Sequence, residues 1–364
     1  MRYLLILLLI VFQTFHGDAQ DLSKLTSLND VVSETSGLIF FDNRVVTHND
    51  SEGMSALYEI NPQDGEISRS VTILNAENVD WEDIAQDDDF IYIGDFGNNN
   101  GNRTNLRIYK LAKSDFISSG EVNAEVINFS YKDQDDFTSA PNDSNYDAET
   151  LIAFGGDLYI FSKNWVDLKS NVYKVPIAPG TYEVDRVDVL DAQGLVTGGT
   201  FNALSNKVLL TGYSGLNAFV IELSGFSGGK FSNGSMNKYN LSIPLTESFQ
   251  VEGIAYRDGT NYYLSAEKNT LGNASLYSLT SNTLGVEDVR LVQVQLYPNP
   301  GRESLMIDGT TDLTKIEIYD YLGKKVFEAS EMNNEVDISQ LPSGVYVVKL
   351  YGNNGSDSRK IIKQ

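Results

Sequence analysis

The sequence predicts an all-β protein, a β-propeller of five blades followed by a small immunoglobulin-like β-sandwich. Three observations carry this prediction. Helical periodicity is nearly absent, and short runs rich in Val, Ile, Tyr and Phe alternate with clusters of Asn, Gly, Asp and Ser. Residues 33–280 repeat one strand pattern in phase. Residues 296–364 form a separate set of short alternating strands.

The first twenty residues, MRYLLILLLIVFQTFHGDAQ, are typical of a secretory signal peptide. Arg2 supplies the positive end, residues 4–12 the apolar stretch, and residues 17–19 a small-residue exit with cleavage expected after Ala19. A short membrane anchor is the alternative, but the apolar run is too short to span a bilayer. No later segment is apolar enough to do so, and we expect no transmembrane segment.

The amino-acid composition excludes some kinds of site and argues against some classes of partner. The chain has no cysteine, which excludes disulfides and thiolate metal sites. Its net charge is −23; residues 291–364 contain 8 basic and 10 acidic side chains and the signal peptide one of each, so residues 20–290 carry −21. An acidic body argues against nucleic acid or anionic lipid as partner. It suits a divalent cation or a cationic ligand, or serves solubility in salty extracellular water.

Each repeat opens with one strand, continues with a hydrophobic second strand that ends in polar residues, and closes with a third strand of Leu/Ile/Val-Tyr type. The repeats open with SETSGLIFF at Ser33, VDWEDIA at Val79, YDAETLIAF at Tyr146, LVTGGTFNA at Leu195 and QVEGIAY at Gln250. A further β run follows most of them. Four antiparallel strands per repeat indicate the blades of a propeller; a flat array of β-sandwiches is the alternative.

The fifth repeat lacks an outer strand, which residues 22–32 could supply by closing the ring. A sixth blade is the alternative if the stretch between the second and third repeats hides one. We therefore expect a signal peptide over 1–19, a propeller over 20–285, a linker over 286–295 and a sandwich over 296–364. In the sandwich, residues 316–319 and 345–348 alternate as half-buried strands do, and residues 321–324 form a hairpin turn.

Aligning the repeats stacks acidic residues into two columns at the opening strand. The first column contains Glu34, Asp80, Asp147 and Gln250. The second, two residues further on, contains Ser36, Glu82, Glu149 and Glu252. Residues two apart on a strand share a face, and the first strand of each blade lines the central channel of a propeller. Several carboxylates are therefore expected to converge near one channel mouth.

The ends of the second strands supply another set of polar residues, which recurs at the same end of the ring if every blade is built alike. This set contains His48, Asn49, Asp50, Asp95, Asn98, Lys163, Asn164, Tyr213, Glu267 and Lys268.

Converging Glu, Asp and Asn oxygens form the kind of site that calcium prefers, and crowded carboxylates repel one another without a cation. The predicted metal ligands are Glu82, Glu149, Glu252, Asp95, Asp80 and Asp147. For Asp80 and Asp147 the alternative is structural, since such residues also bond backbone amides of the neighbouring blade.

The candidate catalytic residues are His48, Glu267 and Lys163. His48 is the one histidine left after signal cleavage, and it could serve as acid–base or be purely structural. The run GDFGNNNGNR over residues 94–103 offers oxygens for calcium but lacks the EF-hand spacing, and a plain turn explains it equally well. The sequence contains no nucleophile-elbow serine, histidine-rich zinc motif or phosphate loop.

The C-terminal motifs resemble a known family. YPNP, IYDYLGKKV, ISQLPSGVYVVKL and the terminal KIIKQ, in this order over residues 292–364, look like the type A C-terminal sorting domain of the type IX secretion system of Bacteroidetes-type bacteria. The resemblance implies the secretion machinery as a partner. It also implies a protein that is released outside the cell or attached to the outer-membrane surface, usually after removal of the tail. A generic carbohydrate-binding sandwich is the alternative.

The propeller repeats also show a distant resemblance. THNDS, DWEDIA with YIGDFGNN, DAETL, VTGG and VEGIA with LSAE are similar to phytase-esterase-like and gluconolactonase-like propellers. The resemblance implies acidic residues, often with calcium, at the channel mouth. Two functions follow as expectations: a calcium-dependent hydrolase of phosphoester or lactone type, or a non-catalytic surface propeller that binds glycan, peptide or metal around structural calcium.

Overall fold

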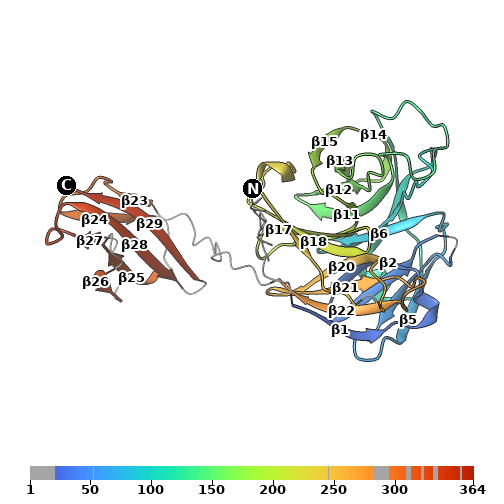
Figure 1. Ribbon diagram of the computed structural model, residues 1–364, viewed down its shortest axis with the longest axis horizontal. Coiled ribbons are helices and arrows are strands. Elements are labelled where there is room, and N and C mark those ends of the chain that lie inside the picture. The colour runs from blue at the N-terminus through green and yellow to red at the C-terminus, as the bar shows by residue number, and fades with distance from the viewer. Residues whose placement is uncertain are drawn as a thin grey trace, which may run out of the picture. The chain divides into compact units, whose positions relative to one another are not determined.

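The structure is a computed structural model that describes residues 21–51, 53–244, 246–281, 295–308, 313–320, 324–330, 335–352 and 355–364. These residues fall into two compact units, one on each side of residues 282–294 (Figure 1). The predicted signal peptide and residues 286–294 of the predicted linker lie outside the described residues.

The N-terminal unit contains five sheets, each built on four antiparallel strands, which are the five predicted blades. Blade one contains β2 (Thr35–Phe41), β3 (Arg44–Asn49), β4 (Ala56–Ile60) and β5 (Ile67–Ile73). Blade two contains β6 (Trp81–Gln86), β7 (Phe90–Asp95), β8 (Arg107–Ala112) and β10 (Glu125–Tyr131). Blade three contains β11 (Ala148–Phe154), β12 (Asp157–Ser162), β13 (Ser170–Pro176) and β15 (Arg186–Leu190). Blade four contains β16 (Leu195–Asn202), β17 (Lys207–Ser214), β18 (Asn217–Ser224) and β19 (Ser235–Asn240). Blade five contains β20 (Val251–Asp258), β21 (Asn261–Ala266), β22 (Ser275–Thr280) and β1 (Asp21–Ser27).

The ring closes as the sequence predicts. β1 is the first described strand of the chain, and it pairs antiparallel with β22 to complete the fifth blade. The inner strands contact one another in a closed cycle, β2–β6–β11–β16–β20 and back to β2. The stretch between repeats two and three contains no strand over residues 132–147, so the described propeller has five blades.

A separate apolar cluster fills each of the five interfaces between neighbouring blades. Trp81 of blade two, for example, packs with Val46 of blade one, and Tyr263 of blade five packs with Leu38 of blade one. Every blade therefore buries both faces of its sheet, which explains the nearly continuous apolar runs of the middle strands.

Two short strands cross blade boundaries, which the repeats do not predict. β9 (Glu121–Val122) pairs parallel with β5 at the outer edge of blade one, and β14 (Gly180–Val184) pairs parallel with β10 at the outer edge of blade two. The helical elements are short: α1 (Lys113–Ser118), η1 (Asp30–Val32) and η2 (Phe231–Asn233). No helix among the described residues is long and apolar enough to cross a membrane.

The C-terminal unit is a two-sheet sandwich. One sheet contains β23 (Gln295–Tyr297), β24 (Ser304–Asp308) and β27 (Glu335–Asp337); the other contains β26 (Lys325–Ala329), β25 (Leu313–Tyr319), β28 (Gly344–Gly352) and β29 (Gly355–Lys363). Leu305 of the first sheet and Ile316, Ile318 and Val348 of the second share one apolar core. Residues 321–323 of the predicted hairpin turn lie outside the described residues, but the flanking strands β25 and β26 pair antiparallel.

Candidate functional site

A β-bulge recurs at the start of the inner strand of all five blades. In blade two, Trp81 pairs with Asp95 and Asp83 with Gly94, which leaves Glu82 as an extra residue in the inner strand. The register shifts by one residue in the other blades too. In blade one the shift contains Ser36 and Gly37 opposite His48, and in blades two to five it contains Glu82, Glu149, Thr197 and Glu252 respectively. A bulge bends the strand and redirects a side chain. The side chains of the second predicted column are therefore redirected as a group.

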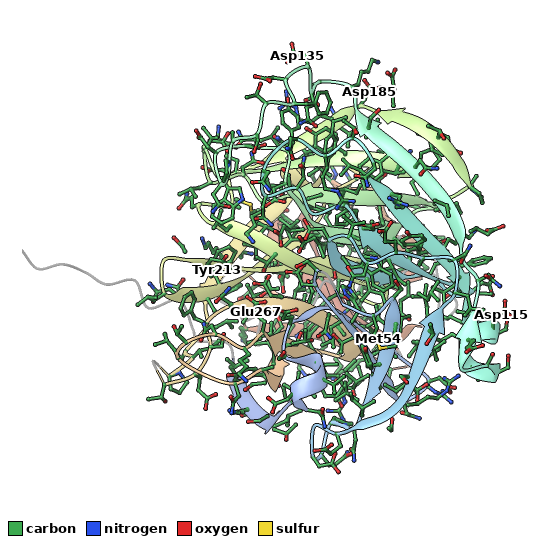
Figure 2. All side chains as sticks on the ribbon, turned by 90° about the vertical axis from the view of Figure 1, so that its right-hand side faces the viewer. Met54, Asp115, Asp135, Asp185, Tyr213 and Glu267 are labelled. Atoms are coloured by element: carbon green, nitrogen blue, oxygen red, sulfur yellow. The ribbon has the colours of Figure 1, made fainter. Side chains whose placement is uncertain are left out.

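Both predicted sets of polar residues lie at the same end of the propeller. The antiparallel pairing places the start of each inner strand beside the end of the second strand. The pairs are Thr35 with Asn49, Trp81 with Asp95, Ala148 with Ser162, Leu195 with Tyr213, and Val251 with Ala266. We call this end the mouth. Figure 2 labels two of its side chains, Tyr213 on the fourth blade and Glu267 on the fifth.

The mouth contains two overlapping groups of carboxylates. Asp50, Asp80 and Glu82 each offer an oxygen within 4.8 Å of the others, and so do Glu82, Asp147 and Glu149. Glu82 belongs to both groups and is 3% exposed, whereas Asp50 and Asp80 are half-buried. The two groups join residues from blades one, two and three around Glu82.

The Asp50, Asp80 and Glu82 group has free ligand atoms. Oδ1 of Asp50 and Oε1 of Glu82 are buried without a hydrogen-bond partner. Gly97 lies directly against this group: a Cβ built on it would overlap Oε1 of Glu82 and stand 2.5 Å from Oδ2 of Asp80. Buried oxygens without donors are costly, and a hard cation such as calcium would satisfy them. These residues therefore fit a divalent cation.

The group around Asp147 and Glu149 is already partly satisfied. Asp147 accepts hydrogen bonds from the backbone N–H of Asn98 at 2.7 Å and from Nε1 of Trp165 at 2.8 Å. Because Asn98 belongs to blade two, Asp147 joins two blades, which agrees with the structural alternative for this residue. Glu149 forms an ion pair with Lys163 at 2.9 Å.

Lys163 is a buried cation of the mouth. Its Nζ lies 5.1 Å from the centre of the Trp165 ring and 5.6 Å from that of Tyr213. Burial alone would lower its pKa, but Glu149 and Glu252 outweigh burial and hold the pKa well above its usual value. Lys163 therefore stays charged and compensates the carboxylates of blades three and five.

Burial shifts the pKa of six carboxyl groups at the mouth. Burial raises the pKa of Asp50 to about 8, of Glu267 to about 7 and of Asp80 to about 6. Burial raises the pKa of Glu82, Glu149 and Glu252 well above the usual value, and neighbouring carboxylates add to the effect. Perturbed carboxylates gathered in one place are typical of functional sites.

Two predicted site residues do not belong to either carboxylate group. Asp95 is fully buried and pairs with Arg103 at 2.9 Å and Arg107 at 3.4 Å, so its charge is already compensated by the GDFGNNNGNR loop and the strand that follows. His48 is fully buried with its ring T-shaped against Trp81 at 5.7 Å, and burial lowers its pKa to about 4. A fully buried imidazole packed against an indole is shielded from substrate, which does not favour the expected acid–base role.

Sequence reasoning misses four features of the site. It places Asp50 in the polar set at the strand ends but not among the ligands, and it does not single out Gly97, Asp83 or Thr197. Thr197 occupies the bulge of blade four, and its Oγ1 donates to the carbonyl of Val251 at 2.5 Å. The alignment of VTGG with the other opening strands could have placed Thr197 in the column.

Asp83 follows Glu82 on the inner strand and is fully buried. Its Oδ1 accepts from the N–H of Ile84 at 2.8 Å, and its Oδ2 accepts from the N–H of Leu151 in blade three at 2.8 Å. These amides lie two residues beyond Glu82 and Glu149 respectively. Asp83 therefore fixes the two adjoining bulges relative to each other.

Comparison with known proteins identifies the family of the C-terminal unit. Residues 295–364 match the family described as the secretion system C-terminal sorting domain. The C-terminal unit is a type IX secretion sorting domain. The chain is therefore a secreted or cell-surface-attached protein, and the sorting domain connects it to the secretion machinery.

One curated relative is the ulvan lyase NLR42 of Nonlabens ulvanivorans, which is 27% identical over 152 residues, 35% of this chain and 28% of that protein. The chain thus spans little more than a quarter of the length of this relative.

Among solved structures, PorZ of Porphyromonas gingivalis, described as a surface component of the type IX secretion system, shows 14% identity and a TM-score of 0.36. The match covers 91% of this chain and 45% of PorZ. The xylosidase/arabinofuranosidase CoXyl43 from a compost metagenome shows 11% identity and a TM-score of 0.44, with coverage of 73% and 96%. A putative glucose dehydrogenase of Thermus thermophilus shows 8% identity and a TM-score of 0.37, with coverage of 72% and 100%. Values this low carry no argument about what the chain binds or does.

Proposed function

We propose that the propeller acts outside the cell as a calcium-dependent hydrolase of phosphoester or lactone type, with the cation held by Asp50, Asp80 and Glu82. The observation that carries the metal is the pair of buried, unpartnered oxygens on Asp50 and Glu82 beside the bare Cα of Gly97. Glu149 and Glu252 complete the acidic surroundings from blades three and five. A bound divalent cation supplies a Lewis acid that polarises the scissile group and acidifies water.

Three side chains of the mouth would have separate roles in hydrolysis. Glu267, with a pKa near 7, is suited to take a proton from water as the water oxygen attacks phosphorus or the carbonyl carbon. The bond to the leaving oxygen then breaks, and the same proton passes to that oxygen. Gln250 donates a hydrogen bond to Glu267 and orients it. Lys163, charged and buried, would steady negative charge on the substrate.

A non-catalytic binding propeller is the second candidate, and the position of His48 favours it. The imidazole is fully buried against Trp81, so proton transfer to or from a ligand at the mouth falls to carboxyl groups alone. In that case the same cation would be structural, joining blades one and two at the mouth, and the mouth would capture a ligand without converting it.

Metal analysis of the full secreted chain, followed by a panel of phosphoesters and lactones with and without EDTA, separates the two candidates. We expect bound calcium and EDTA-sensitive turnover, both lost in Glu82→Gln and kept in the matched surface variant Glu121→Gln. Metal binding without turnover of any substrate would favour the binding propeller. Glu82→Gln and Glu149→Gln variants with unchanged metal content and thermal stability would refute the site itself.

A further inference from the structure

The loops that surround the mouth expose large apolar side chains from blades one, three, four and five and from the segment between blades two and three. They belong to the loops between second and third strands and to the connections that enter each inner strand. We call this set the apolar rim: Val31, Met54, Phe137, Val166, Leu216 and Leu271. Met54 is 67% exposed and Leu216 is 56% exposed.

The opposite end of the propeller exposes fewer large apolar side chains than the mouth. In the described part of the propeller, its loops and the short helix α1 carry two exposed large apolar side chains, Ile117 and Leu204. Single exposed apolar residues are normal on protein surfaces. Their concentration around one end of the propeller is what indicates an interaction surface.

The rim encloses negative charge. Glu34 is exposed, and Asp50, Asp80 and Glu267 are half-buried at the mouth, above the more deeply buried Glu82, Glu149 and Glu252. Lys163 is the one lysine or arginine that pairs directly with these seven carboxylates in the described structure. Residues 20–290 also carry a net charge of −21, so the long-range field attracts cations and repels anions.

We propose that the mouth binds a cationic, amphipathic segment of another protein or peptide. Apolar side chains of that segment would pack on the rim, and its Lys or Arg side chains would pair with Glu34 and Glu267. Charge complementarity selects this occupant: an anionic lipid surface or nucleic acid would meet the same carboxylates and be repelled. The proposal does not require hydrolysis, because Glu34 and Glu267 lie outside the Asp50, Asp80 and Glu82 group that would hold the metal.

The test measures binding of a synthetic amphipathic helix built of Leu and Lys to the calcium-loaded full chain. We expect saturable binding that weakens with added salt, and little or no binding of the same helix with Glu in place of Lys or Ser in place of Leu. Leu216→Ser and Leu271→Ser should each weaken binding about tenfold, as expected for losing one buried leucine at an interface. The matched control Leu204→Ser, on the opposite face of the same blade as Leu216, should leave it unchanged.

Three results would overturn the proposal. One is equal binding of the Leu/Glu helix. Another is an equal loss of binding in Leu204→Ser and Leu216→Ser. The third is rim-dependent binding to phosphatidylcholine vesicles with no binding of the Leu/Lys helix, which would assign the rim to a lipid surface. Calcium binding should be the same in the rim variants as in the unmodified chain, so these results are independent of the proposed hydrolase.

Discussion

Gly97 lies against the carboxylate of Glu82, and a side chain at Gly97 would occupy the space that Oε1 of Glu82 now fills. The GDFG segment after the second strand of blade two thus has a definite role. It brings bare backbone to the mouth and leaves two carboxylates, Glu82 and Asp80, room to face a ligand.

Gly97→Ala should therefore abolish calcium binding. The new Cβ would overlap Glu82 and crowd Asp80, which must both move. The matched control is Gly120→Ala, where an added Cβ meets nothing within 4 Å. Metal content after dialysis against calcium is the measurement, and equal content in the two variants would contradict the assigned role.

The metal-free propeller should lose stability as pH rises from about 4 to about 8. Burial raises the pKa of Asp80 to about 6, of Glu267 to about 7 and of Asp50 to about 8. In this range the three carboxyl groups bind more protons in the folded state than in the unfolded state, which outweighs the opposite effect of His48, whose pKa is lowered to about 4. The free energy of unfolding therefore falls with increasing pH. Calcium should restore stability, and more strongly at the upper end. Urea unfolding at several pH values, with EDTA and with calcium, checks this; a metal-free curve that rises with pH would refute it.

Asp83→Ala should lower the free energy of unfolding by roughly 2–4 kcal/mol, because it leaves the buried N–H groups of Ile84 and Leu151 without their acceptor. Asp83→Asn keeps one acceptor oxygen and should cost less. Chemical denaturation of both variants measures the difference. If the alanine variant were as stable as the unmodified chain, Asp83 would not be joining blades two and three.

Deleting residues 21–27 should destabilise the propeller strongly, because β1 completes blade five and Leu22 packs on the cluster between blades four and five. The expected result is a lower melting temperature together with faster proteolysis within blade five, where β22 would become an edge strand. Removal of an equally long stretch within residues 132–147, a loop without strands, is the comparison. If the variant without β1 melted at the same temperature as the variant with the shortened loop, or at a higher one, ring closure by this strand would be contradicted.

Much of this architecture can be predicted from the repeats. The in-phase opening strands predict five blades, and the missing outer strand of the fifth repeat predicts closure by the N-terminal segment, as β1 confirms. The sorting domain is predictable from its motifs because four of them occur in order. These features follow from local patterns that each repeat or motif carries by itself.

The details of the site depend on contacts that strand patterns do not encode, some between blades and some within one blade. Strand alternation alone does not predict that Glu82 and Glu149 occupy bulges, nor that Gly97 makes room beside them. His48 lies near the end of a second strand, and Glu267 lies just after one, so the two positions look alike in the sequence. In the structure, however, His48 packs against Trp81 of the next blade and is buried beside the apolar cluster between blades one and two. Asp95 is paired instead with Arg103 of its own blade, eight residues away in the loop that follows.

Titration calorimetry of calcium into the metal-free full chain tests the central claim most directly. The account predicts one dominant site with a dissociation constant on the order of 1 mM or tighter, as for extracellular calcium sites. It also predicts that binding is lost in Glu82→Gln and retained in Glu121→Gln. Absence of binding in the unmodified chain, or binding that is the same in Glu82→Gln, would contradict it.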